Sequence, residues 1–148
     1  MTKIRLTKEF DFEMAHALWN YDGACSNIHG HSYRLFVTVI GEIKGNSDDP
    51  KNGMVTDFGD LKNLVKTLLI NDFDHSLVIS SKADISCIAA SKQMFDRVRV
   101  VDFQPTCENL LVYFASKISE SLPGNLKLYS LKLNETATSY AEWFSDDN

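Results

Sequence analysis

The sequence predicts an α+β fold, in which an antiparallel four-stranded sheet combines with two helices in the order β-β-α-α-β-β. Apolar residues alternate with polar ones along four segments, as strands require, and recur at helical spacing along two others. Strands that follow one another in the chain can pair as antiparallel neighbours. The 148 residues suit one domain, 1–148, with 44% hydrophobic and 24% charged residues, as is typical of soluble globular proteins.

The first two strands are predicted at residues 3–14 and 31–43. Both segments carry apolar side chains at alternate positions, and the second also carries them on its other face, so we expect it to be mostly buried. Residues 19–28 contain asparagine, aspartate and glycine, which favour a loop. The apolar residues of these two strands are Ile4, Leu6, Phe10, Phe12, Met14, Tyr33, Leu35, Phe36, Val37, Val39 and Ile40.

Two clear helices and two further strands follow. Thr56 or Asp57 can cap a helix whose apolar residues recur from Phe58 to Leu69. Pro105-Thr106 opens the second helix, which ends at Pro123-Gly-Asn125. The last two strands are predicted at 126–131 and 138–144. Between the helices the pattern is weaker: residues 72–77 leave the first helix, 86–95 favour a short helix, and 97–103 alternate like a strand.

Charge and cysteine content narrow the class of protein. The formal net charge is −5 and no basic stripe is present, which argues against a nucleic-acid partner. The first residues lack the apolar run of a secretory signal, and no apolar segment approaches the roughly 18 residues of a membrane span. Three cysteines are an odd number without framework spacing, so we expect a reduced, cytoplasmic protein without disulfides.

Three of the four histidines lie close together in the sequence. His29 and His31 are two residues apart, so on a strand both imidazoles leave the same face. His16 ends the first predicted strand, and antiparallel pairing through the loop would bring it opposite the other two. Three imidazoles suit zinc and leave a fourth position for water or substrate, although such sites also accept iron, nickel or copper. Three unrelated histidines would be the alternative.

The remaining candidate residues are ambiguous on spacing alone. Cys25 precedes His29 by four residues and could be a metal ligand, a reactive thiolate beside the metal, or a buried apolar residue. Cys87 and Cys107 are predicted to be packing residues. Asp74 next to His75 could fix the imidazole tautomer for proton transfer, or form a polar turn after the helix.

Two glutamates are also candidates. Glu135 follows an apolar strand and could bind the N–H edge of a heterocycle, or be solvated. Glu108 lies in the first turn of the second helix, where the helix dipole already explains a carboxylate.

Taken in order, these residues resemble the 6-pyruvoyltetrahydropterin synthase family and its 6-carboxytetrahydropterin synthase branch. The resemblance runs from about residue 3 to 143, and the three residues between Cys25 and His29 are typical of that branch. The motifs are Phe10-x-Phe12-x-x-Ala15-His16, Cys25-x-x-x-His29-Gly30-His31, Asp57-Phe58-x-x-Leu61, Asp74-His75-x-Leu77, Pro105-Thr106-x-Glu108-Asn109-Leu110 and Glu135-Thr136.

The resemblance implies a T-fold, an antiparallel four-stranded sheet with two helices on one face, and association as a homo-hexamer built from two trimers or as another homo-oligomer. It implies that His16, His29 and His31 bind Zn²⁺. Cys25 would be the general acid/base, and Asp74 with His75 would relay protons. Glu135 would anchor the pterin ring and join that relay, and Thr106 and Glu108 would lie near the pterin pocket. No role is implied for residues 78–104.

The implied activity is a zinc-dependent lyase that converts 7,8-dihydroneopterin triphosphate to 6-carboxy-5,6,7,8-tetrahydropterin, acetaldehyde and triphosphate, in the synthesis of queuosine precursors. Pyruvoyltetrahydropterin synthesis, which eliminates triphosphate without carbon loss, is the alternative within the family. A non-catalytic, zinc-stabilised assembly module is a more distant alternative, and a β-barrel that binds nucleic acid fits the charge poorly.

Overall fold

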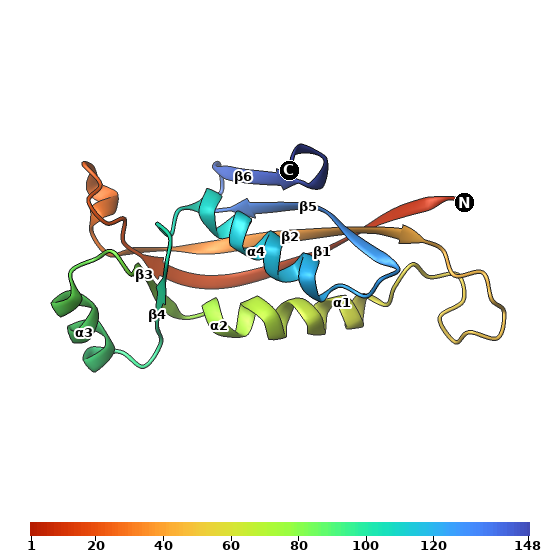
Figure 1. Ribbon diagram of the computed structural model, residues 1–148, viewed down its shortest axis with the longest axis horizontal. Coiled ribbons are helices and arrows are strands. Elements are labelled where there is room, and N and C mark those ends of the chain that lie inside the picture. Colours follow the sequence, from red (N-terminus) through yellow and green to blue (C-terminus); the bar gives the residue numbers. More distant parts are fainter.

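The computed structural model describes all 148 residues and contains one mixed sheet of six strands, in the order β4-β3-β1-β2-β5-β6. Helices accompany the sheet, and two of them, α1 and α2, are joined end to end (Figure 1). The strands are β1 (Lys3–His16), β2 (His29–Glu42), β3 (Ser76–Ser80), β4 (Val98–Val101), β5 (Leu126–Asn134) and β6 (Tyr140–Phe144). The helices are α1 (Phe58–Val65), α2 (Asn71–Phe73), α3 (Ile85–Met94) and α4 (Cys107–Ser121).

The centre of the fold is a long antiparallel hairpin formed by β1 and β2. Its register runs without interruption from the pair Lys3–Glu42 to the pair His16–His29. Residues of one parity in each strand are buried, so the hairpin presents an apolar face to the helices and a more polar face to the other side. Both strands extend further toward the intervening loop than the predicted limits of 3–14 and 31–43, and this extension takes in His16 and His29.

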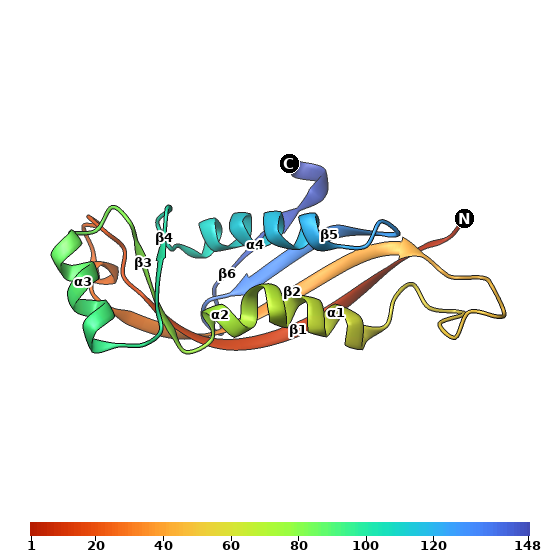
Figure 2. The same ribbon diagram turned by 60° about the horizontal axis from the view of Figure 1, so that its bottom comes forward.

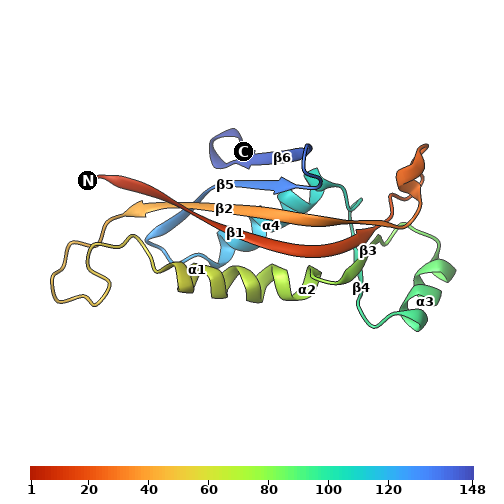
Figure 3. The same cartoon turned by 180° about the vertical axis from the view of Figure 1, so that it is seen from behind.

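The two predicted long helices cover that apolar face. Asp57 caps α1 by accepting a hydrogen bond from the Gly59 amide, and a π-helical stretch, Lys66–Ile70, connects α1 to α2. Thr106 caps α4 through the Asn109 amide. Figure 2 shows the two helices side by side over the sheet, and Figure 3 shows β1, β2 and β5 crossing in front of α4. Side chains from both helices and from this sheet face form one buried cluster of 24 residues.

The prediction of an antiparallel four-stranded sheet is wrong in the number of strands and in the direction of two of them. β3 pairs parallel with β1, and β4 pairs parallel with β3, so the sheet has six strands and is mixed. Every residue of β3 is buried, which removes the alternation that marks a half-exposed strand. The expected strand at 97–103 and helix at 86–95 are present as β4 and α3.

The histidine end of the hairpin lies at one end of an elongated molecule. The loop between β1 and β2 and helix α3 gather at this end, whereas the N-terminus and the loop between β2 and α1 lie at the other (Figure 1). None of the helices is long and apolar enough to cross a membrane.

Candidate metal and pterin site

The structure brings His16, His29 and His31 together on the helix-covered face of the hairpin. His16 pairs directly with His29 across the strands, and His31 follows two residues later on the same face. The ring centroid of His16 lies 4.5 Å from that of His29 and 5.3 Å from that of His31. One nitrogen from each ring falls within 4.8 Å of the others, so the three could hold one ion.

Backbone carbonyls orient two of these rings. The Nδ1 atoms of His16 and His29 lie 2.6 and 2.8 Å from the carbonyl oxygens of Pro105 and Asn27. Donation from Nδ1 leaves Nε2 as the unprotonated nitrogen, which is the form that binds a metal. The Nε2 atoms of His16 and His31 are buried and have no hydrogen-bond partner.

Burial also lowers the pKa of His16, which favours the neutral imidazole. A buried nitrogen without a partner is costly, and a metal ion would satisfy it. The residues present therefore fit a divalent cation.

Glu135 lies directly after β5 and faces the histidines. Its carboxylate is 3.8 Å from His31 Nε2, and the hydroxyl of Tyr33 donates to it at 3.3 Å. Tyr33 is 1% exposed, and burial together with the charge of Glu135 raises the pKa of this hydroxyl, so it remains a donor. Sequence reasoning missed Tyr33 as a site residue, although its position two residues after His31 on the same strand face could have indicated it.

A cavity of about 300 Å³ joins these groups to most of the other predicted residues. It is roomy enough for a small heterocycle and combines imidazole, thiol and carboxylate groups. The predicted site residues that line it are His16, Cys25, His29, Thr106, Glu108 and Glu135.

Cys25 reaches this cavity from a short 3₁₀ turn, Ala24–Ser26. The Leu18 amide donates to the Cys25 carbonyl at 2.9 Å, which ties the turn to the end of β1. The loop is also fastened to the α4 side, because the Trp19 backbone exchanges two hydrogen bonds with the Gln104 side chain. These hydrogen bonds therefore hold the turn that carries Cys25 at the cavity that His16 and His29 also line.

Cys107 lines the same cavity, so its prediction as a simple packing residue was incomplete. Its thiol donates to the Leu133 carbonyl at 3.3 Å. Burial and the charge of Glu135 raise the pKa of this thiol to about 12, so it stays protonated and is unsuited to act as a nucleophile.

Asp74 and His75 are not brought to this cavity. His75 Nδ1 lies 3.0 Å from Asp74 Oδ1, but His75 lines a separate groove of about 750 Å³. That groove is lined by Glu13, Ala15 and Gly30, which alternate with the histidines along the hairpin, and also by Met14 and His31. Within one copy of the chain, His75 thus shares a groove with His31 but lies outside the cavity that His16, Cys25, His29 and Glu135 line.

Sequence comparison identifies relatives over nearly the whole chain. Residues 5–146 match the family described as 6-pyruvoyl tetrahydropterin synthase. The 6-carboxy-5,6,7,8-tetrahydropterin synthase of Haemophilus influenzae is 30% identical over 141 residues, which cover 94% of this chain and 97% of the relative. The protein of the same name from Aquifex aeolicus is 33% identical over 165 residues, covering 95% and 98% of the two chains.

Solved structures show the same fold. A protein of Wolinella succinogenes described as uncharacterized aligns with a TM-score of 0.81 at 21% identity, covering 98% of this chain and 99% of that one. The 6-pyruvoyl tetrahydropterin synthase of Caenorhabditis elegans aligns with a TM-score of 0.68 at 24% identity, covering 98% and 97%. From the match over residues 5–146 and these relatives, we conclude that the chain belongs to the 6-pyruvoyl tetrahydropterin synthase family.

Proposed function

We propose that this chain is a zinc-dependent 6-carboxytetrahydropterin synthase that acts on 7,8-dihydroneopterin triphosphate in the synthesis of queuosine precursors. The observation that carries the proposal is the shared cavity, in which Cys25 and Glu135 flank His16 and His29. The printed names of the relatives and the three-residue spacing between Cys25 and His29 support the carboxy branch of the family.

Each residue has a part in the proposed chemistry. A zinc ion held by His16, His29 and His31 would polarise the side-chain hydroxyls of the substrate and acidify the adjacent C–H bonds. Cys25 removes a proton from the side-chain carbon next to the ring. Glu135 accepts hydrogen bonds from the N–H edge of the pterin, and the Tyr33 hydroxyl orients its carboxylate. Triphosphate leaves by elimination, one water adds to the side chain, and two of its three carbons depart as acetaldehyde while the third remains as the 6-carboxylate.

The position of Asp74 and His75 leads us to propose that the working enzyme is an oligomer. Because they lie outside the cavity that Cys25 and Glu135 line, we propose that a neighbouring copy presents them to it. A mixture of the Cys25→Ala and His75→Ala variants tests this, since mixed oligomers would contain some sites with both residues intact. We expect mixing after dissociation and reassembly to restore part of the activity. Two inactive variants that stay inactive when mixed would contradict a shared site.

The activity itself is tested by mass analysis of products formed from 7,8-dihydroneopterin triphosphate, with and without added zinc. We expect 6-carboxytetrahydropterin and acetaldehyde from the wild type, and none from His29→Ala. A product that retains all the side-chain carbons would instead identify pyruvoyltetrahydropterin synthesis, the reaction in the name of the Caenorhabditis elegans neighbour.

Metal removal separates catalysis from a purely structural role of the histidines. The 24 residues of the buried apolar cluster form a core that does not need the histidines as apolar members, although His16 is itself only 2% exposed. We expect a chelator to abolish turnover while circular dichroism and the cooperative melting transition persist. Unfolding on chelation would favour the zinc-stabilised assembly module.

A further inference from the structure

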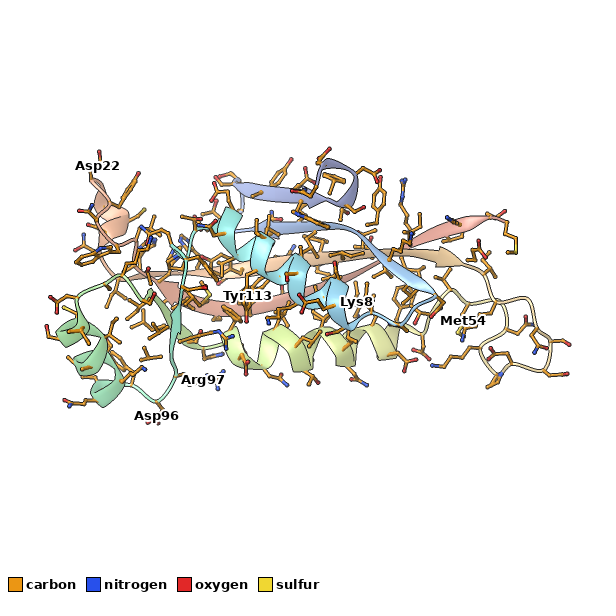
Figure 4. The ribbon with its side chains drawn as sticks, in the orientation of Figure 1. Lys8, Asp22, Met54, Asp96, Arg97 and Tyr113 are labelled. Atoms are coloured by element: carbon orange, nitrogen blue, oxygen red, sulfur yellow. The ribbon has the colours of Figure 1, made fainter.

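The segment between β3 and α4 supplies one side chain that reaches back to the Asp74–His75 turn. Arg97 precedes β4, and Figure 4 shows it at the foot of that strand, near the end of α2. Its Nη2 donates to the Asn71 carbonyl at 2.5 Å and its Nε donates to the Asp74 carbonyl at 3.0 Å. These carbonyls lie at the C-terminal end of the helix, where a cation is favourable.

The backbone on either side of His75 is held as well. The Arg97 carbonyl accepts from the Leu77 amide at 2.9 Å, so Arg97 binds the chain both before and after His75. On the opposite side, Glu13 of β1 donates its amide to the Asp74 carboxylate at 2.9 Å and accepts from the His75 amide at 2.6 Å. The turn is therefore fixed between β1 and the residue that leads into β4.

These hydrogen bonds hold an unfavourable backbone conformation, because His75 has a φ of 58°. The left-handed region is unfavourable for residues with a Cβ atom and persists where surrounding contacts enforce it. The His75 side chain is 72% exposed, so packing of the imidazole does not hold it there. The contacts that hold it are those from Arg97, Glu13 and the adjacent carboxylate.

We propose that Arg97 is a positioning residue, which holds His75 in its left-handed conformation and so aims the imidazole for proton transfer. This rests on the proposed function, in which His75 relays protons. It gives a role to a segment for which the sequence resemblance implied none. Arginine suits the position because its planar group can donate to two carbonyls at once, whereas lysine presents one flexible ammonium.

The test combines Arg97→Met with His75→Ala in a double-mutant cycle. We expect Arg97→Met to lower kcat about 10- to 100-fold, the scale expected when a catalytic group is displaced by about 1 Å. The KM and the bound zinc should stay within about twofold of wild type, and Arg97→Lys should recover part of the loss. In the His75→Ala background Arg97→Met should have no further effect on kcat, because the residue acts through His75.

Arg99, two residues later and within β4, provides a matched control. It donates to Asp72 at 3.1 Å and to Tyr113 at 2.9 Å, so it braces the same helix end without touching Asp74 or His75. We expect Arg99→Met to lower the melting temperature but to leave kcat unchanged. Equal losses of kcat in the two variants, or losses from Arg97→Met and His75→Ala that simply add, would overturn the proposal.

Hydrogen exchange gives a readout that does not require turnover. The His75 amide, bonded to Glu13, should exchange faster in Arg97→Met and at the wild-type rate in Arg99→Met. Unchanged exchange at His75 in Arg97→Met would refute the restraint. Absence of pterin turnover in the wild type would overturn the proposed function instead, and full activity in His75→Ala would remove the relay role of His75 alone.

Discussion

At the scale of single residues, two backbone carbonyls orient the proposed metal site. Pro105 and Asn27 each face one Nδ1 atom, so the fold rather than a second layer of charged side chains sets the tautomers of His16 and His29. No carboxylate is hydrogen-bonded to those two nitrogens, and Glu135 lies beside His31. The proposed metal contacts and the proposed pterin contact therefore involve different residues, so each can be tested separately.

Cys25→Ala should lower turnover by about 10²- to 10⁴-fold, the usual contribution of a general acid–base group. Zinc content should stay at the wild-type level, since the three imidazoles complete the protein ligands. Turnover is followed by product mass and zinc by elemental analysis. A Cys25→Ala protein that lost its zinc would mean that the thiol is a ligand, and the proposed mechanism would be wrong.

Tyr33→Phe should lower kcat/KM without reducing the amount of bound metal. The variant removes the hydroxyl that donates to Glu135 but keeps the ring, which stacks on Phe12 at a centroid distance of 5.1 Å. A hydrogen bond to a charged group contributes about 1.5–3 kcal/mol, so we expect kcat/KM to fall about tenfold or more. In a Glu135→Gln background the same substitution should matter less, and equal effects in both backgrounds would contradict the assigned partner.

Acid should remove the contribution of the ionised Asp74 carboxylate to the stability of the fold. Partial burial of Asp74 raises its pKa, but hydrogen bonds from the Glu13 amide and His75, together with the charge of Arg97, outweigh this, so the pKa lies below its ordinary value. A carboxyl whose pKa is lower in the folded state stabilises the protein above its unfolded pKa of about 3.9, and this contribution is lost as the pH falls through the folded value.

Asp74→Asn should therefore reduce stability at pH 7, while the two proteins should converge in stability below about pH 3. Urea titrations at both pH values measure this. A difference that is equally large at pH 7 and in acid would contradict the contribution from ionisation.

At the scale of elements, Gly41 is required by the close approach of three segments. A Cβ atom there would lie 2.8 Å from Val55 Cγ1, 2.9 Å from the Asn125 carbonyl oxygen and 2.9 Å from Leu126 Cδ2. Gly41→Ala should destabilise the protein by about 1–3 kcal/mol, as overpacking does. Gly45→Ala is the control, because a Cβ atom at Gly45 meets nothing within 4 Å. Equal free energies of unfolding for the two variants in chemical denaturation would contradict the close approach at Gly41.

The elements that could be predicted are those with a periodic pattern. The β1–β2 hairpin alternates over 14 residues in each strand, and α4 has an apolar stripe with Thr106 as its cap, so both followed from the sequence. Strand β3 is five residues long, buried throughout and bounded by serines, which leaves no period to detect. Its parallel pairing with β1 joins segments about 60 residues apart, and no local pattern specifies such a contact.

The same distinction applies to the site. The convergence of His16, His29 and His31 could be expected because strand parity and hairpin pairing determine it. The placement of Asp74 and His75 could not, because it depends on β3 and on contacts from Arg97, which are both non-local.

At the scale of the whole molecule, the sheet ends in two strands, β4 and β6, that each pair on one side only. Unpaired strand edges favour association, and ring closure of several copies would remove them. We expect light scattering after size exclusion to give the mass of three or six chains. A monomeric species with full pterin turnover would contradict both the oligomer and the shared site.

The φ of 58° at His75 has a consequence for attempts to improve this protein. Glycine or asparagine adopts the left-handed region at less cost, so a heat-challenge screen should enrich substitutions at position 75. We expect these variants to have a higher melting temperature and to lack pterin turnover. Selection for thermal stability alone would therefore remove the imidazole on which the proposed proton relay depends.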